Sequence, residues 1–97
     1  MNPMSEILKK RDNIVSRKVA GDSLLIPIRG RLADMQRIFA VDSVGEFVWD
    51  HIDGRNTLAQ ILDAVAEEFE VDRATAREDL LAFIKSLRRT ELLESPP

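Results

Sequence analysis

The residues whose types could support chemistry are few in this chain. Its single histidine, His51, and its single tryptophan, Trp49, both lie in the stretch FVWDHIDGRNTLAQI, residues 47–61. A metal site needs several ligands at defined spacing, and the sequence has no second histidine and no cysteine. A serine or threonine nucleophile would need a base, but His51 falls at the end of an expected helix, where the helix dipole favours a histidine. We therefore interpret His51 as structural and expect no catalytic residue, no metal and no cofactor.

The other polar clusters also lack a catalytic pattern. The acidic sequence EEFE at residues 67–70 has no partner arrangement for acid–base catalysis and fits a solvated helix face. The four glycines are isolated, so no glycine-rich loop is available to hold a phosphate. Gly54 suits the end of one helix and Thr57 the start of the next. The stretch around His51 is thus predicted to be a joint between two helices, with Trp49 as a core anchor.

Length and composition indicate one modest domain. The chain has 97 residues, of which 44% are hydrophobic and 32% charged. No apolar run approaches the ~20 residues of a membrane helix, and the N-terminus has no apolar segment typical of a secretion signal. We expect a cytoplasmic protein without a membrane partner. Residues 1–13 are expected to form a flexible tail, followed by a single domain at residues 14–94.

Charge is unevenly distributed along the chain. Residues 1–41 carry eight Lys or Arg against four Asp or Glu, whereas residues 42–97 carry six against thirteen. The net charge of −3 argues against a general nucleic-acid binder, so no nucleic-acid partner is expected. An anionic partner would have to bind a local basic patch.

Residues 14–41 show the alternation typical of β-strands. Val15, Arg17 and Val19 alternate before Gly21-Asp22, and Leu24, Ile26 and Ile28 alternate after it. This pattern predicts two short strands joined as a hairpin by a Gly-Asp turn. Pro27 is unusual inside a strand, since proline usually marks an edge or a bulge. After the loop GRLADM, residues 36–41 predict a third strand.

After residue 41 the periodicity is helical. Asp42 or Ser43 caps a first helix, Thr57 caps a second with a full apolar stripe, and Asp72 caps a third that runs to about Arg89. The closing ELLE is predicted to be a short strand or a docking segment. A small sheet must bury one face, and three helices can cover it. The predicted fold class is α+β and winged-helix-like, with a three-stranded antiparallel sheet followed by a three-helix bundle.

The last helix carries a second strip beside its core stripe. At about 100° per residue, basic and apolar side chains mix along this strip. Its members are Arg73, Arg77, Leu81, Ile84, Lys85 and Arg88. One interpretation is a wide core edge whose cations reach solvent. The other is the wall of a groove for an extended, partly acidic ligand.

The third strand favours the groove. In a three-stranded meander it would lie at an edge with unpaired backbone groups, which proteins normally protect. The sequence QRIFAV has one charge and no proline. An open edge beside an amphipathic helix suits a peptide that adds as an extra strand. The strand comprises Gln36, Arg37, Ile38, Phe39, Ala40 and Val41.

The order and spacing of these features resemble the PqqD-like family. The matching motifs are D-x-x-G-x-x-x-W at residues 42–49, D-G-x-x-T at 53–57, F-x-V-D at 69–72 and D-L-x-x-F-I-x-x-L at 79–87. A closing Leu-Leu follows, and the similarity covers about residues 15–94.

The resemblance implies a non-catalytic, winged-helix-like domain that recognises ribosomally made precursor peptides. Such a domain holds the leader segment as a strand against its third strand, beside its last helix. It presents the peptide to a modifying enzyme, often of the radical S-adenosylmethionine type. Here these positions would be residues 36–41 and the strip on the last helix. Two features depart from the family: Glu91 where a glycine is common, and an approach to the third strand unlike that of members acting on the pyrroloquinoline quinone precursor.

Other functions stay open at this point. A winged-helix DNA-binding regulator would use the arginines of the last helix, against the unfavourable net charge. An enzyme is disfavoured because no set of residues offers nucleophile, base and orienting group together. An open strand edge could also be met by a second copy of the chain, which would give a homodimer.

Overall fold

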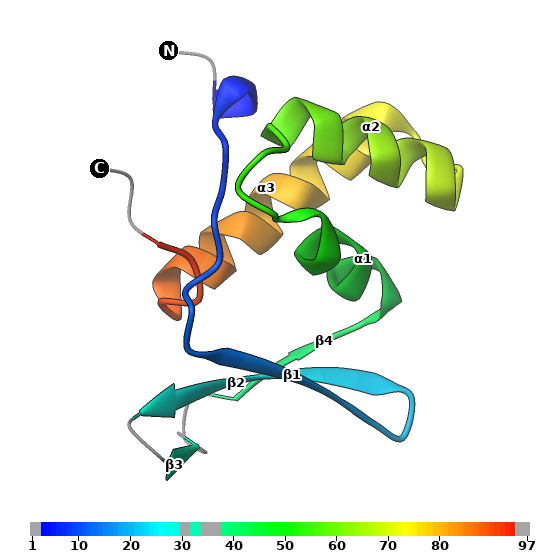
Figure 1. Cartoon of the computed structure of the whole chain (residues 1–97). Coiled ribbons are helices and arrows are strands. Elements are labelled where there is room, and N and C mark those ends of the chain that lie inside the picture. Colours follow the sequence, from blue (N-terminus) through cyan, green and yellow to red (C-terminus); the bar gives the residue numbers. More distant parts are fainter. Residues whose placement is uncertain (1–2, 30–31, 34–37, 95–97) are drawn as a thin grey trace.

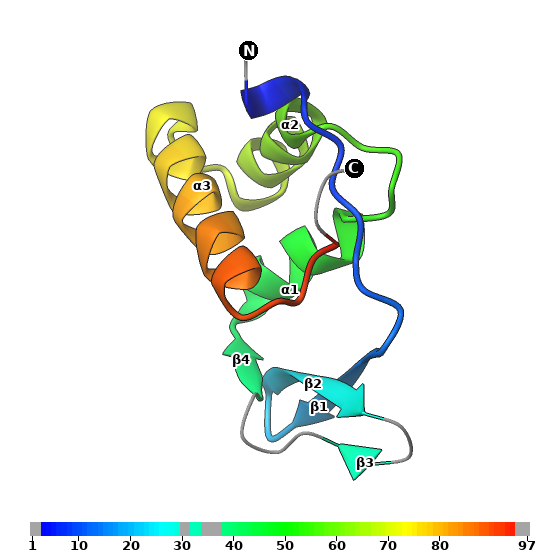
Figure 2. The ribbon, with the colours of Figure 1, turned by 90° about the vertical axis from the view of Figure 1, so that its left-hand side faces the viewer.

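Three helices lie on one side of a small β-sheet (Figure 1). The computed structural model describes residues 3–29, 32–33 and 38–94. In chain order the elements are η1 (Pro3–Ser5), β1 (Ile14–Val19), β2 (Asp22–Arg29), β3 (Leu32–Ala33), β4 (Phe39–Val41), α1 (Ser43–His51), α2 (Leu58–Phe69) and α3 (Arg73–Arg89). The view turned by 90° shows the same two layers (Figure 2). The predicted α+β fold, antiparallel strands followed by three helices, is confirmed.

The β1–β2 hairpin forms as predicted, with its turn shifted by one residue. Val19 pairs with Asp22, so the two turn residues are Ala20 and Gly21. Both have positive φ angles, 51° and 89°, as in the type I′ turn that matches the twist of the flanking strands. Gly21 adopts this conformation without steric cost.

Strand β2 is central, because β1 pairs on one side while β3 and β4 pair on the other. β4 is antiparallel to β2, and Leu25 lies opposite Phe39. A third strand was predicted at residues 36–41, and the structure has a strand at Phe39–Val41. Ile38 comes just before this strand, and residues 36 and 37 lie outside the described residues. The short β3 was not predicted, since its two residues lie in a segment that reads as a loop.

Pro27 occupies a gap between two ladders. The Ile28 N–H donates to the Asn13 carbonyl, on the β1 side, at 2.7 Å. Successive residues of a strand turn their backbone groups to opposite sides, so the nitrogen of Pro27 faces away from β1. There β4 pairs with residues 23–25 and β3 with residues 28–29. Neither ladder needs the N–H that proline lacks, which explains a proline within a central strand.

All three helices begin at the predicted capping residues. The side chain of Asp42 accepts a hydrogen bond from the Gly45 N–H at 2.8 Å, and Asp72 caps α3 in the same way. Thr57 and Gln60 form a reciprocal capping box, with hydrogen bonds of 2.8 and 3.2 Å. These caps fix where the helices start, and the apolar stripes then pack into one core.

The N-terminal segment is packed, which corrects the expected flexible tail for the residues described from Pro3 on. Met4 and Leu8 are buried in the core. Backbone hydrogen bonds join this segment to the α1–α2 loop and to the C-terminal segment, for example from the Gly54 N–H to the Leu8 carbonyl at 3.0 Å. Lys10 also lies 4.9 Å above the Trp49 ring. The burial of Met4 and Leu8 and the backbone hydrogen bonds together hold a segment whose sequence is mostly polar.

The C-terminal segment docks as predicted. Leu92 and Leu93 are buried, and Leu93 forms an isolated antiparallel bridge with Lys10. The N-terminal segment thus lies between the α1–α2 loop and the C-terminal segment, and helices far apart in sequence are tied together through it.

Candidate functional site

The backbone of Ala40 is turned toward the open edge of β4. Ile28 bonds to the β1 side, so the alternation along β2 turns Leu25 and Ser23 toward β4. Their partners Phe39 and Val41 must then face β2, and Ala40, opposite Leu24, faces away. The N–H and C=O of Ala40 therefore point to the side where an additional strand could pair.

Helix α3 stands beside this edge and meets it through an aromatic contact. The rings of Phe39 and Phe83 lie 6.1 Å apart, centroid to centroid, at an interplanar angle of 57°. Phe83 is half-buried and flanks the stripe of α3 that packs into the core, whose members are Ala76, Leu80, Ile84 and Leu87. The flank of α3 that carries Phe83 is thus the flank that faces the sheet edge.

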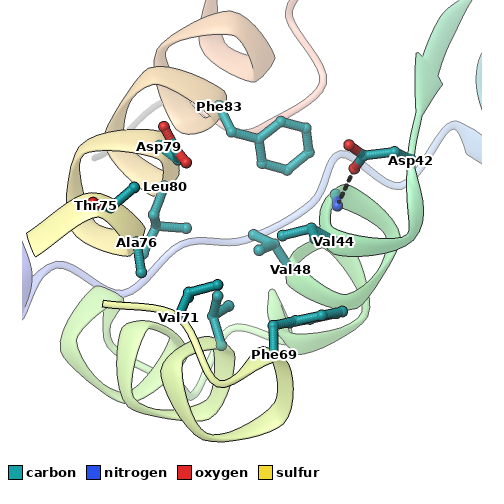
Figure 3. A pocket seen from close by; sticks show the side chains of 12 residues that line it. Asp42, Val44, Val48, Phe69, Val71, Thr75, Ala76, Asp79, Leu80 and Phe83 are labelled. Atoms are coloured by element: carbon teal, nitrogen blue, oxygen red, sulfur yellow. Dashed lines mark hydrogen bonds between the residues drawn. The ribbon is translucent and has the colours of Figure 1, made fainter. Parts of the chain in front are cut away.

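A pocket opens between α1, α3 and the α2–α3 turn (Figure 3). Its volume is about 320 Å³. The wall is mostly apolar, and Phe83 projects into the space between the two helices. The lining residues are Asp42, Val44, Gly45, Val48, Val65, Phe69, Val71, Thr75, Ala76, Asp79, Leu80 and Phe83. Because Val44 and Val71 are exposed large apolar residues, the pocket is ready to bury apolar groups of a partner.

Gly45 allows α1, β4 and α3 to approach each other at the pocket. A Cβ at this position would meet the Val41 Cβ at 3.0 Å and the Phe83 Cε1 at 3.4 Å. Any larger residue would push the Phe83 ring or the end of β4 away. The glycine of the D-x-x-G motif is thus explained by packing.

The polar rim of the pocket is acidic. Asp42 and Asp79 lie on either side of Phe83 in Figure 3, and Asp42 is held by its bond to the Gly45 N–H. Glu46, one residue beyond Gly45, accepts a hydrogen bond from Ser23 at 2.7 Å and lies 3.4 Å from the Lys18 ammonium. The Ser23 hydrogen bond, with the charge of Lys18, lowers the pKa of Glu46. The Glu46 carboxylate thus connects α1 to the β1–β2 hairpin.

A comparison with protein families matches residues 24–93 to the model for "Coenzyme PQQ synthesis protein D (PqqD)". This chain belongs to the PqqD family. No curated protein sequence matches the chain. A solved structure described as "TbiB1 in Complex with the TbiA(beta) Leader Peptide" superposes with a TM-score of 0.72 at 29% identity, covering 92% of this chain and 98% of that one.

In this PqqD-family chain the predicted site has two parts, the strand at residues 36–41 and the strip on α3. In the described residues, only some members of the two parts lie close together. Phe39 and Ala40 lie at the edge beside Phe83, with Ile38 just before them. On α3, Arg73 forms an ion pair with Asp63 of α2, and Arg88 forms one with Glu6 of the N-terminal segment. Around the helix axis Arg88 falls about 140° and Arg73 about 80° from Phe83, and neither arginine lines the pocket.

The remaining predicted residues are placed as follows. Ile84 is buried in the core, Leu81 is half-buried, and Arg77 and Lys85 are exposed. At about 100° per residue, Arg77, Leu81 and Arg88 fall 120–160° from Phe83, and Lys85 falls farther round. Val41 is buried, while Gln36 and Arg37 lie outside the described residues. Peptide binding by the strip on α3 stays a prediction, and the geometry favours the other flank.

Sequence reasoning missed Thr75, Asp79 and Phe83 as site residues. Periodicity places Phe83 in the core stripe and assigns no role to Thr75 or Asp79, because a helical wheel has two flanks beside any core stripe. The side on which the sheet edge lies decides between them, and that depends on tertiary packing. The aromatic residue at position 83 beside small and polar neighbours was the signal that could have found this flank.

His51 and Trp49 have structural roles in the PqqD-family fold. The His51 Nδ1 lies 2.8 Å from the Phe47 carbonyl, and the His51 ring stacks against Phe47 with centroids 4.2 Å apart. Trp49 is buried beneath Lys10. Within the part of the chain that the structure describes, no group of three or more His, Cys, Asp or Glu residues is arranged to hold a metal ion. Nor does that part contain a helix long and apolar enough to cross a membrane.

Proposed function

We propose that this chain binds the leader segment of a ribosomally made precursor peptide by strand addition at β4. The observation that carries the proposal is the outward-facing backbone of Ala40 beside the Phe83 pocket. The similarity to a structure described with a leader peptide, together with membership of the PqqD family, supports the same function.

Strand addition accounts for both affinity and selectivity. The N–H and C=O of Ala40 would pair with the peptide backbone, which is independent of peptide sequence. Alternate peptide side chains would point to the same face as Phe39 and Val41, toward Phe83 and the pocket. Burial of apolar side chains there supplies the selectivity for particular leaders.

The chain would then act as a carrier for a modifying enzyme. We propose a radical S-adenosylmethionine enzyme as this partner and the cytoplasm as the compartment, as the family resemblance implies. Catalysis would belong to the partner, since binding needs no nucleophile or base on this chain. Copurification of this chain with the enzyme encoded beside it, in the presence of the peptide, would test the assignment.

An amide NMR titration with precursor peptides encoded near this gene tests the binding proposal. We expect chemical-shift changes at Phe39–Val41, at Phe83 and at Val71, because these residues border the edge and the pocket. Changes confined to Arg77, Leu81 and Lys85 would move the peptide to the opposite flank of α3. An unchanged spectrum with every neighbouring peptide would contradict the function.

Ala40→Pro gives the sharpest test of strand addition. Proline removes an N–H that the β2–β4 ladder does not use, so the fold should persist while peptide binding is lost. Ser16→Pro is the matched control: by the same alternation the backbone of Ser16 faces away from β2, at the distant edge of β1. This variant should bind normally. Equal loss of binding in both variants, with both folded, would contradict pairing at β4.

Methylation of the peptide backbone provides a test that leaves the protein unchanged. In an added strand, alternate peptide nitrogens face β4. Methylation at alternate positions should therefore abolish binding, and methylation at the positions between should not. A uniform response to methylation would contradict strand pairing even if the protein variants fail to fold.

A second copy of this chain could use the same edge, so a homodimer through β4 would compete with the peptide. Analytical ultracentrifugation with and without the peptide separates the two states. The DNA-binding alternative has no support from either comparison, and Arg73 and Arg88 of α3 are engaged in ion pairs within the chain.

A further inference from the structure

The charged side chains around the Phe83 pocket are acidic, which favours a ligand that carries positive charge. Among the residues that the structure describes, the charged side chains lining the pocket are Asp42 and Asp79, and none of the lining residues is Lys or Arg. Asp42 is exposed, and its Oδ1 accepts the hydrogen bond that caps α1. Asp79 is exposed and makes no ion pair with the residues that the structure describes.

The cations of α3 do not offset this acidic rim. Arg73 and Arg88 pair with Asp63 and Glu6 and do not line the pocket. At about 100° per residue, Arg77 and Arg89 fall about 120° from Phe83 and Lys85 about 160°. The ligand that the basic strip suggested, a partly acidic segment, would thus bring like charges to Asp42 and Asp79. Like charges placed together at an interface disfavour binding and exclude the wrong partner.

We propose that the Phe83 pocket selects a leader segment in which an apolar side chain is flanked, within two positions, by Lys or Arg. This inference rests on the proposed function and deepens it. The apolar side chain would occupy the floor formed by the buried residues Val48, Ala76 and Leu80. The flanking cation would lay its aliphatic stem over Phe83 and its charged end beside Asp79.

The expected contribution to affinity is modest, because the rim is exposed to solvent. Exposed ion pairs typically change a binding constant by about two- to five-fold, and salt screens them. The larger effect is on choice of partner, since an acidic residue at the same position meets repulsion from two carboxylates. The signature to look for is therefore a change in preferred sequence as well as a change in affinity.

Selection from a random peptide library displayed on phage tests the proposal without knowledge of the natural leader. The wild-type chain should enrich peptides that carry Lys or Arg within two positions of an apolar anchor. Asp79→Lys should abolish or invert this preference. Glu78→Lys is the matched control, because Glu78 is an exposed neighbour whose side chain falls about 140° from Phe83 on the helix. It makes the same charge change away from the pocket and should leave the preference intact.

The outcomes separate this inference from the proposed function. Enriched peptides that lose binding in Ala40→Pro but show no preference for cations, or prefer acidic residues, would overturn the inference and leave strand addition standing. The same holds if Asp79→Lys selects the same peptides as wild type. Peptides that bind equally well to Ala40→Pro, or the absence of any enrichment, would overturn both. A cation preference that Asp79→Lys reverses and Glu78→Lys retains establishes the inference.

Discussion

At the scale of single residues, Phe83 links the two parts of the candidate site. Its ring contacts Phe39 of β4 and also lines the pocket beside α1. Gly45 allows the N-terminal end of α1 to lie close to the Phe83 ring. An aromatic side chain in this position can be covered on one face by the protein and on the other by a bound peptide, which is typical of residues that dominate binding energy.

Phe83→Ala should weaken peptide binding about ten-fold or more, as for a central aromatic contact. Leu81→Ala is the control: Leu81 is also half-buried on α3 but lies on the opposite flank. This variant should keep its dissociation constant, measured by fluorescence polarisation with a labelled leader peptide. The reverse pattern would place the peptide along the basic strip.

Asp53 controls an acid-sensitive contribution to stability at the α1–α2 joint. Its carboxylate accepts hydrogen bonds from the N–H groups of Asn56 and Arg55 at 2.8 and 2.9 Å, and these bonds lower its pKa. The ionised form is favoured in the folded state, so this stabilisation is present above the unfolded pKa of about 3.9. It is lost as pH falls through the lower folded pKa.

Asp53→Asn should therefore be less stable than wild type at neutral pH, and the difference should shrink below the folded pKa. Urea unfolding followed by Trp49 fluorescence, across the acidic range, measures it. A difference that stays constant with pH would mean that the charge of Asp53 contributes nothing.

At the scale of elements, the caps and the apolar stripes together determine the helices. α2 buries Leu58, Ile61, Leu62 and Val65, and its first turn is closed by the Thr57–Gln60 capping box. A helix of 12 residues is marginal in isolation, so packing of this stripe supplies most of its stability and the capping box adds to it. Strand β4 has only three residues, too few to be determined by its own sequence pattern. It forms because β2 and the helices hold these residues in place.

Thr57→Ala should destabilise the folded state by about 1 kcal/mol, the usual cost of losing an N-terminal capping side chain. Thr57→Ser, which keeps the hydroxyl, should recover most of the loss. Chemical denaturation of both variants checks the prediction. A neutral Thr57→Ala variant would show that packing of the stripe alone fixes the start of α2.

At the scale of the whole molecule, the N-terminal segment holds together parts of the chain that are distant in sequence. Both views show it running beside the helices toward the sheet (Figures 1 and 2). It pairs with the α1–α2 loop at Ile7 and Thr57 and with the C-terminal segment at Lys10 and Leu93. Its buried residues extend the core beyond the three helices.

Leu8→Ala should cost about 2–5 kcal/mol of folding stability, because it leaves a cavity in the core. The adjacent Ile7→Ala is the control, since Ile7 is 53% exposed whereas Leu8 is 4% exposed. Ile7→Ala should change stability by no more than about 0.5 kcal/mol. Equal effects of the two substitutions in thermal unfolding would mean that the segment is not packed in solution.

Much of the local structure is determined by the sequence alone. The capping residues Asp42, Thr57 and Asp72 and the stripe of α2 follow from short-range rules, and the structure has them where those rules place them. The hairpin follows from the same rules, with its turn one residue earlier than predicted. The structural roles of His51 and Trp49 were also accessible, because a lone histidine at a helix end and a lone tryptophan have few alternatives. The family motifs depend on the same short-range spacing.

Only the tertiary structure decided which surfaces face the open edge of β4. Periodicity identifies the core stripe of α3 but treats its two flanks as equivalent. Only the position of β4 distinguishes the flank with Phe83 and Asp79 from the flank with Leu81 and Arg88. The burial of Met4 and Leu8 likewise depends on contacts with segments about 50 and 85 residues away, such as those at Gly54 and Leu93. Short-range patterns carry no information about such contacts, because the energy that fixes them comes from burial against distant parts of the chain.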